Sequence, residues 1–286
     1  MKSKRPNIEA FKTYTQHFPK MNLKPYIAAK MTPGVGDLML AMNIAYLRSM
    51  YLQRTVTLDL HWYHDKSFLY HFEDPETIIE RAAYIRNFYN EEFVDVRIRN
   101  IFNSSHTQLS HDRYINFERA YYKRVKHNIR YNDWYFRKSG LKTIDKKVVI
   151  WTQTGNAQDP RPFKRPYDRS EWNDVICIIE MQGYSVVEID YRTPISEVMY
   201  HIGTAEVCLC YEGMWHYIAK NFCKPMIVLT KDFITQYHTP DALIYKVRKA
   251  DQHPMSYFYK FDRRVEVAKK FAEVQKNRIR GFYVEN

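Results

Sequence analysis

Two kinds of hydrophobic segment alternate along most of the chain, and this alternation restricts the fold more than any other feature. Short apolar runs that predict β-strands occupy residues 25–31, 55–62, 93–102, 148–151, 184–189, 205–210 and 225–229. Segments with the length of helices lie between them, at residues 37–53, 74–89, 170–182, 194–202 and 214–222. Gly183 is typical of a residue that ends a helix. Repeated strand-helix-strand units predict an α/β protein with parallel sheets and right-handed crossovers.

One segment interrupts the alternation and predicts a domain boundary. Residues 113–138 are rich in basic and aromatic side chains and end at Ser139-Gly140. We therefore expect two Rossmann-like domains that face a cleft, residues 1–140 and residues 141–262. Residues 263–286 predict a final amphipathic helix that crosses back to the first domain, with three apolar residues spaced to pack: Val267, Phe271 and Val274.

Charge and cysteine content indicate the surroundings in which the chain works. It has 44 Lys and Arg against 32 Asp and Glu, a formal net charge of +12. This excess favours polyanionic partners, although many basic proteins bind no nucleic acid. We expect a cytoplasmic protein without a membrane span, because long apolar runs and a secretory signal pattern are missing from the sequence. Four cysteines lie in apolar segments without the spacing of a zinc site and are expected to be reduced core residues: Cys177, Cys208, Cys210 and Cys223.

Glycines gather where predicted strands end. Gly34 and Gly36 follow the first strand, Gly155 follows the strand that ends at Trp151, and Gly213 follows the strand that ends at Cys210. These are four of the eight glycines in the chain. Ligands of open α/β sheets bind at the carboxyl ends of strands, and glycine lets backbone amides approach a phosphate closely. The three loops are therefore candidate ligand-binding loops, although the residues of the first alone favour a tight turn with Asp37 as a helix N-cap, a role that can coexist with ligand binding.

Taken in order, three stretches resemble the heptosyltransferase-like family of sugar-nucleotide glycosyltransferases, which has the GT-B fold. Gly36-Asp37 opens the first helix, "VVIWTQTGNAQDPRPFKRPYDRSEW" begins the second domain, and "CYEGMWHYIAKNFCKPMIVL" follows later. Within the last stretch, Gly213 to His216, Ala219 and the strand from Pro225 to Leu229 match the family's order. The resemblance extends from about Pro25 to Thr230.

The resemblance implies a nucleotide-sugar donor in the second domain, taken as UDP-linked, with no further cofactor. Asp37 is implied to be the general base that deprotonates the acceptor hydroxyl, in an inverting reaction. Donor-binding roles are implied for Thr154, Gly155, Lys164, Arg165, Glu212, Gly213 and His216. Glu212 departs from the family's small hydroxyl residue, so we expect it to face hydroxyl groups of the sugar or ribose, with a helix cap as its alternative role. His216 has an alternative role as a buried helix residue, and Lys164 and Arg165 one as solvated loop charges.

The acceptor is predicted from charge. The basic segment and the overall composition favour double-stranded DNA, specifically a hydroxymethylated or already glycosylated base of phage DNA, which would be modified in the host cytoplasm. A solvated helix whose aromatic side chains pack in the core is the open alternative for residues 113–138. Residues expected on the acceptor side are Gly34, Gly36, Lys123, Arg124, Lys126 and Arg130. Two alternatives stay open: a glycosyltransferase of lipopolysaccharide or another surface glycan, and a non-enzymatic nucleic-acid-binding protein.

Metal-independent transfer is expected, with no metal-ligating residue. The sequence has no D-x-D signature. The histidine-rich segment with His61, His64, Asp65 and His71 has nothing that fixes these side chains on one face.

Overall fold

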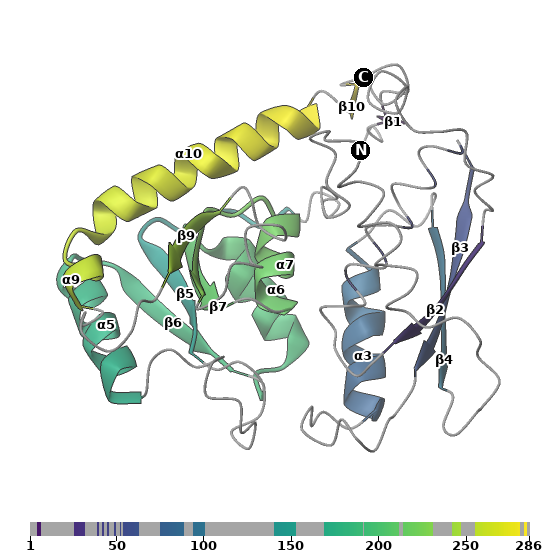
Figure 1. The fold of residues 1–286 in the computed structure, drawn as a ribbon, viewed down its shortest axis with the longest axis horizontal. Coiled ribbons are helices and arrows are strands. Elements are labelled where there is room, and N and C mark those ends of the chain that lie inside the picture. The colour runs from purple at the N-terminus through teal and green to yellow at the C-terminus, as the bar shows by residue number, and fades with distance from the viewer. Residues whose placement is uncertain are drawn as a thin grey trace. The chain divides into compact units, whose positions relative to one another are not determined.

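The chain divides into two compact units in the computed structural model (Figure 1). The first unit contains residues 1–69, 73–137 and 277–286, and the second contains residues 70–72 and 138–276. The structure describes residues 5–6, 26–31, 39, 42, 45, 49, 52, 54–62, 75–88, 94–100, 140–152, 169–190, 192–211, 214–230, 242–246, 255–280 and 283–284. The domain limits expected at residues 140 and 262 stay predictions.

A three-stranded parallel sheet forms the described part of the first unit. Its strands run in the order β2 (Tyr26–Met31), β3 (Val56–Trp62) and β4 (Val94–Asn100). Tyr26 pairs with Thr57, and Val56 pairs with Val94. All three strands lie where the hydrophobic runs predict them. Their register is parallel, as the strand-helix-strand pattern requires.

Helical structure connects these strands. Between β2 and β3, the described residues Met39, Met42, Ala45 and Ser49 are helical and fully buried. Their spacing of three or four residues places them on one helix face, which explains their common burial. Between β3 and β4, helix α3 (Pro75–Arg86) begins at a proline, which is favoured in the first turn. Helix α3 contacts β4, and Ile85 is buried.

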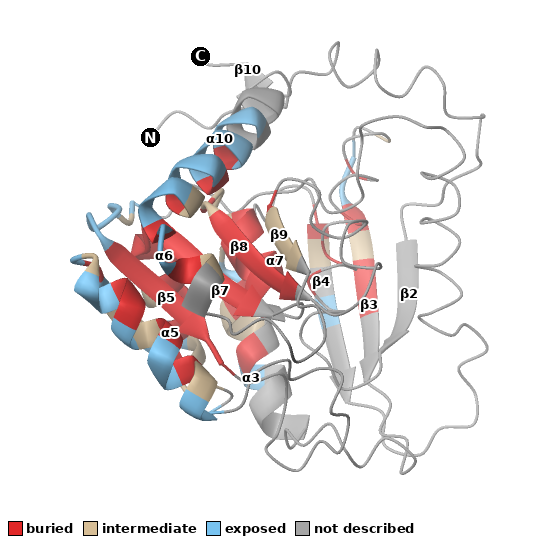
Figure 2. Cartoon of the chain, turned by 60° about the vertical axis from the view of Figure 1, so that its left-hand side comes forward, coloured by how far each residue is buried: buried red, intermediate tan, exposed pale blue. Residues whose placement is uncertain are grey.

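A five-stranded parallel sheet is the centre of the second unit. The strands are β5 (Lys147–Trp151), β6 (Ser185–Ile189), β7 (Val207–Tyr211), β8 (Met226–Thr230) and β9 (Leu243–Lys246). Their order in the sheet is β6-β5-β7-β8-β9, and every neighbouring pair is parallel. All residues of β5 are buried, and Figure 2 colours β5 and β8 almost entirely as buried. Burial on both faces is typical of a parallel sheet covered by helices.

Helices cover this sheet on both faces. The crossover helices are α5 (Arg169–Met181), α6 (Ile195–Thr204) and α7 (Met214–Asn221). The step from β5 to β6 crosses the sheet in one direction, and the steps from β6 to β7 and from β7 to β8 cross it in the other. With right-handed crossovers, α5 therefore covers one face, and α6 and α7 cover the other. The contacts between α6 and α7 agree with this arrangement, and α5 contacts the short helix α9 (Met255–Phe258) instead. Helix α5 ends where predicted, because Gly183 has a φ of 83° and its amide donates to the Glu180 carbonyl at 2.8 Å.

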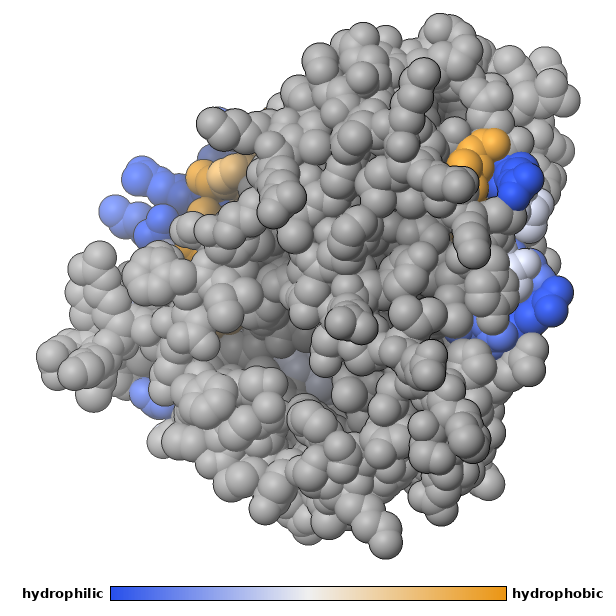
Figure 3. All heavy atoms as spheres, turned by 45° about the vertical axis from the view of Figure 1, so that its right-hand side comes forward, coloured by the Kyte–Doolittle hydropathy of each residue, from blue (hydrophilic) through white to orange (hydrophobic). Residues whose placement is uncertain are grey.

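The last helix, α10 (Phe261–Arg280), is longer than most and packs through a different face than the sequence predicts. Its buried residues are Phe261, Val265, Ala268 and Ala272. The predicted stripe is exposed, at 37% for Val267, 37% for Phe271 and 55% for Val274. Charged residues of α10 flank that stripe in the sequence of the helix. Figure 3 shows one face of the molecule, on which described hydrophobic residues lie next to described hydrophilic ones.

Several further features differ from the expectations. Strand β9, helix α9 and a two-stranded antiparallel pairing of β1 (Arg5–Pro6) with β10 (Tyr283–Val284) are not predicted by the hydrophobic pattern. Cys208 and Cys210 are buried as expected, whereas Cys177 is exposed on α5 and Cys223 is only partly buried. None of the four cysteines forms a disulfide.

The fold class is α/β, as predicted, with parallel sheets in both units. Within the described helices, none is long and apolar enough to cross a membrane. The expected cleft between two domains stays a prediction.

Candidate functional site

The strand order of the second unit identifies the candidate site, which lies at the edge of the sheet formed by the carboxyl ends of the strands. From β5 the chain first adds β6 on one side and then β7 on the other, so β5 and β7 are neighbours at the point where the order reverses. In open α/β sheets, ligands bind outside the carboxyl ends of the two strands at such a point. Residues 153–168 follow β5, and residues 212 and 213 follow β7.

Most residues with a predicted donor-binding role follow these two strands. Thr154, Gly155, Lys164 and Arg165 belong to the segment after β5, and Glu212 and Gly213 to the segment after β7. The strand order thus brings the starts of both segments to one part of the sheet edge, which the hydrophobic pattern alone does not show. The six residues themselves lie outside the described part of the chain.

An aromatic pair connects the end of β5 with the first turn of α7. The rings of Trp151 and Trp215 have centroids 4.0 Å apart and are tilted by 41°. Both residues are nearly buried, at 4% and 5% exposure. A tightly packed aromatic contact of this kind stabilises the position of one element on another. The start of α7 is therefore fixed beside the carboxyl end of β5, and a helix start presents unpaired amides and a partial positive charge to an anion.

His216 is the one predicted site residue whose side chain the structure describes, and it is fully buried. Its ring lies 4.0 Å from the ring of Tyr217, with a tilt of 38°. This burial favours the packing role that the sequence left open beside donor binding. A direct donor contact by His216 stays a prediction.

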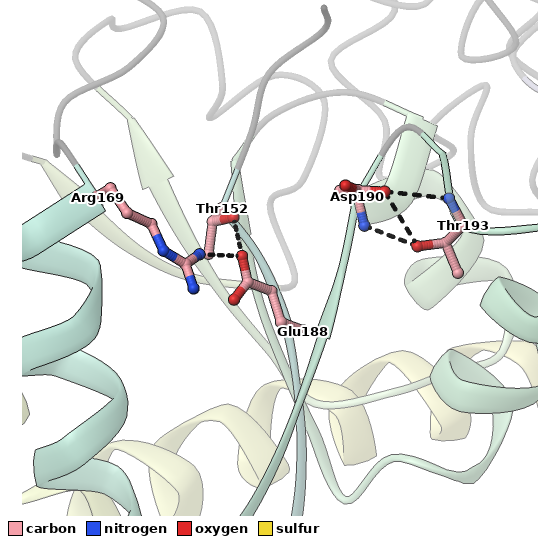
Figure 4. A network of polar contacts seen from close by, with 5 residues as sticks. All are labelled: Thr152, Arg169, Glu188, Asp190 and Thr193. Carbon is pink, nitrogen blue, oxygen red and sulfur yellow. Dashed lines mark hydrogen bonds and ion pairs between the residues drawn. The ribbon is translucent and has the colours of Figure 1, made fainter. Parts of the chain in front are cut away.

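Glu188, near the end of β6, is a polar residue of this edge that the sequence analysis missed (Figure 4). Its Oε1 atom accepts a hydrogen bond from the Thr152 hydroxyl at 2.6 Å and pairs with the Arg169 guanidinium. The hydrogen bond to Glu188 raises the pKa of Arg169 above its ordinary value. A glutamate in an alternating strand is typical of a solvent-facing residue, which is why the pattern gave no signal.

A second group in Figure 4 shapes the turn between β6 and α6. One carboxylate oxygen of Asp190 accepts hydrogen bonds from the amides of Arg192 at 2.7 Å and Thr193 at 3.1 Å. The Asp190 amide in turn donates to the Thr193 hydroxyl at 3.0 Å. These bonds form an Asx-type turn, which satisfies the backbone where β6 ends and explains the sharp change of direction.

The opposite edge of the same sheet holds a cluster of basic residues. The Lys147 ammonium donates to the Thr204 hydroxyl at 2.6 Å and lies 3.2 Å from Nδ1 of His201. It also lies 5.0 Å from the centre of the Tyr200 ring. Burial lowers the pKa of Lys147, and burial together with the Lys147 charge lowers the pKa of His201. Because this cluster is at the amino end of β5, it is separate from the candidate site.

The predicted residues of the first unit fall outside the described residues. Asp37 comes six positions after β2 ends at Met31, and the next described residue, Met39, is helical and buried. The position of Asp37 at the start of a helix stays a prediction. The other acceptor-side residues also lie outside the described part: Gly34, Gly36, Lys123, Arg124, Lys126 and Arg130.

Metal-ligating side chains do not cluster among the residues that the structure describes, where no group of three His, Cys, Asp or Glu could hold an ion. His61 lies on β3, but His64, Asp65 and His71 are outside the described residues.

Comparisons with known proteins give structural likenesses only. Neither a protein-family model nor a curated protein matches the chain. Among solved structures, the iron-containing dodecameric glycosyltransferase TibC from enterotoxigenic E. coli is similar, with a TM-score of 0.44, 12% identity and coverage of 90% of this chain and 78% of TibC.

Two further solved structures are similar at the same level. A glycosyl transferase family 9 protein from Veillonella parvula has a TM-score of 0.41 and 11% identity, covering 90% of this chain and 99% of that one. The E. coli heptosyltransferase WaaC with ADP-2-deoxy-2-fluoro heptose has a TM-score of 0.39 and 11% identity, covering 87% and 99%. Likenesses of this size assign neither an activity nor a substrate to the present chain.

Proposed function

We propose that the chain is a glycosyltransferase that moves a sugar from a nucleotide-sugar donor to a hydroxyl group. The observation that carries the proposal is the strand order β6-β5-β7-β8-β9. In this order β5 and β7 are neighbours, and the carboxyl ends of two such strands are where sheets of this kind bind nucleotides. The proposal is supported further by the sequence after each strand, which contains glycine and resembles a donor-binding segment of the heptosyltransferase-like family.

The proposed donor site uses charge and backbone amides to hold the diphosphate. Backbone amides near Thr154 and Gly155, together with Lys164 and Arg165, supply positive potential from the segment after β5. The start of α7 supplies more from the other side, with its position fixed by the contact between Trp151 and Trp215. Glu212 is assigned to hydroxyl groups of the sugar or ribose, because a carboxylate repels phosphate. UDP is the proposed nucleotide.

The proposed chemistry is a single displacement at the anomeric carbon. The acceptor oxygen bonds to that carbon while its proton passes to the Asp37 carboxylate. The bond between the anomeric carbon and the diphosphate oxygen breaks, and the nucleoside diphosphate leaves with the electron pair. Attack from the face opposite the diphosphate inverts the anomeric centre. Cationic side chains and helix dipole stabilise the leaving group in this proposal, so we expect no requirement for a divalent metal.

The proposed acceptor is a hydroxymethylated base in double-stranded DNA. Its support is the net charge of +12 and the basic segment that includes Lys123, Arg124, Lys126 and Arg130. A hydroxymethyl group on a pyrimidine lies in the major groove and offers a primary hydroxyl. A surface glycan is the alternative acceptor, and the experiment below includes it.

The test is turnover of a panel of radiolabelled nucleotide sugars. Each is incubated with hydroxymethylated DNA, unmodified DNA, a truncated lipopolysaccharide, or no acceptor. We expect label to enter hydroxymethylated DNA alone, with transfer retained in a chelator. Label in the lipopolysaccharide alone would overturn the DNA acceptor and keep the enzyme class. Absence of both binding and turnover for every nucleotide sugar would overturn the glycosyltransferase proposal.

Asp37→Asn tests the assigned base in the same assay. The amide cannot accept the hydroxyl proton but can still cap the helix, so we expect donor binding to be kept and transfer to be lost. An equal loss of both would show that Asp37 acts only as a structural cap.

A further inference from the structure

Glu188 joins two residues that stand on either side of the proposed donor-binding segment. Thr152 is the last described residue before residues 153–168, and Arg169 is the first after them. Both side chains bind the same carboxylate oxygen of Glu188, with the Thr152 hydroxyl at 2.6 Å (Figure 4). A single carboxylate on β6 therefore connects the end of β5 with the start of α5.

The placement of Arg169 is not explained by the helix to which it belongs. Arg169 is the first residue of α5, where the partial positive charge of the helix start disfavours a cation. Glu188 offsets this cost, because its carboxylate accepts a charge-assisted hydrogen bond from the guanidinium. The ion pair therefore stabilises the contact between α5 and β6 rather than helix α5 itself.

This contact also adds little to the folding stability of the second unit. The side chains of Arg169 and Glu188 are 60% and 27% exposed, and ion pairs with this much solvent contact add little to folding free energy. What the contact does restrict is the distance and direction between the two ends of the intervening segment. Fixed ends reduce the conformations open to that segment before a ligand binds, which lowers the cost of binding.

We propose that Glu188 is a positioning residue for the donor site. It holds Thr152, which follows β5, and Arg169, which begins α5, at set positions relative to β6, and residues 153–168 join these two residues. This inference rests on the proposed function, since it deepens the role of the segment that contains Thr154, Gly155, Lys164 and Arg165. Glu188 itself contacts no donor atom in this proposal.

The test compares Glu188→Ala with Glu206→Ala. Glu206 is a matched control: it also pairs with a lysine, Lys269, and accepts from the Lys146 amide, but it precedes β7 at the opposite edge of the sheet. Hydrogen exchange of residues 153–168 is measured first, without donor. We expect faster exchange in Glu188→Ala and no change in Glu206→Ala. Equal exchange of this segment in wild type and Glu188→Ala would overturn the proposal.

Donor kinetics give the second measurement. We expect Glu188→Ala to raise the KM for the nucleotide sugar about tenfold while kcat changes less, since a loosely held segment weakens binding. The variant Glu188→Gln keeps an acceptor for Thr152 but loses the charge that binds Arg169, and is expected to lie between wild type and Glu188→Ala. An unchanged KM in Glu188→Ala would overturn the positioning role.

A third variant shows whether the residues act through one contact. The double variant Glu188→Ala with Arg169→Ala should raise KM no more than Glu188→Ala alone does, because the contact with Arg169 is already lost in that single variant. Additive effects would mean that Glu188 acts independently of Arg169 and would overturn the proposal. If wild type turns over no nucleotide sugar while the exchange result holds, the structural contact stands and the donor role fails together with the proposed function.

Discussion

Replacing His216 with alanine separates the two roles that this histidine can have. The side chain is fully buried in α7, with the centroid of its ring 4.0 Å from that of Tyr217, whereas the sequence resemblance implies a donor-binding role for it. A packing residue and a donor contact predict different measurements. Packing changes the free energy of unfolding, whereas a donor contact changes the affinity for a nucleotide.

The expected loss of stability follows from the burial. Removing the ring leaves a cavity in the interior of the unit and deletes an aromatic contact, which together cost about 2–4 kcal/mol of unfolding free energy. Urea unfolding followed by circular dichroism measures this change. Isothermal titration calorimetry without urea, under conditions in which the variant is folded, then measures its affinity for UDP. We expect the dissociation constant for UDP to stay as in wild type.

Ile218→Ala is the matched control, because Ile218 is equally buried on the same helix. It should cost a similar amount of stability, about 2–5 kcal/mol, without altering UDP affinity. The packing account is refuted if His216→Ala weakens UDP binding about tenfold, or about 1.4 kcal/mol, while Ile218→Ala does not. It is also refuted if His216→Ala leaves the unfolding free energy unchanged.

Three further predictions concern the second unit. Gly183→Ala should lose about 1–2 kcal/mol of stability in urea unfolding, because the φ of 83° disfavours a side chain; a neutral result would contradict this. Gly203→Ala should lower the free energy of unfolding by up to about 2 kcal/mol, because its Cβ would lie 2.4 Å from Cδ1 of Leu141. In a Leu141→Ala background the same substitution should raise the free energy of unfolding by up to about 1 kcal/mol, since alanine favours a helix more than glycine does. Equal effects in both backgrounds would exclude the clash. Because burial and Lys147 lower the pKa of folded His201, the unfolded chain binds the proton first, so stability should fall as pH drops below about 6.5. His201→Asn should weaken this fall between pH 7.5 and 5.5, and an identical fall in the variant would contradict the assignment.

The order of strands and helices was predictable because periodicity and glycine positions reflect local physics. The alternation of short and long apolar segments gave nearly all described elements of both sheets, and Gly183 gave the end of α5. Strand β9, Leu243–Lys246, was missed because its apolar run is interrupted by a tyrosine and a lysine, and its described side chains are only partly buried. A short run of mixed polarity does not stand out from loop sequence.

Helix α10 shows where periodicity becomes ambiguous. Its sequence contains two stripes with helical spacing, and the larger residues Val267, Phe271 and Val274 predict the wrong packing face. The buried face includes Ala268 and Ala272, which are small and therefore add little to a hydrophobicity pattern while allowing a close approach. Tertiary packing selected the face, and the sequence of the helix alone does not contain that information.

The candidate site was predictable in part for the same reason. The glycine segments could be found as local motifs, but their meeting at β5 and β7 depends on strand order. Glu188 could not be found at all, because its partners Thr152 and Arg169 are 36 and 19 positions away in the sequence. A contact over such separations has no local signature in one sequence.

A crystal structure with a bound nucleoside diphosphate tests the central claim most directly. We predict that the diphosphate lies outside the carboxyl ends of β5 and β7, with its oxygens within hydrogen-bonding distance of backbone amides near Gly155 and at the start of α7. A nucleotide bound at the amino edge of the sheet beside Lys147, or bound only by the first unit, would contradict the account.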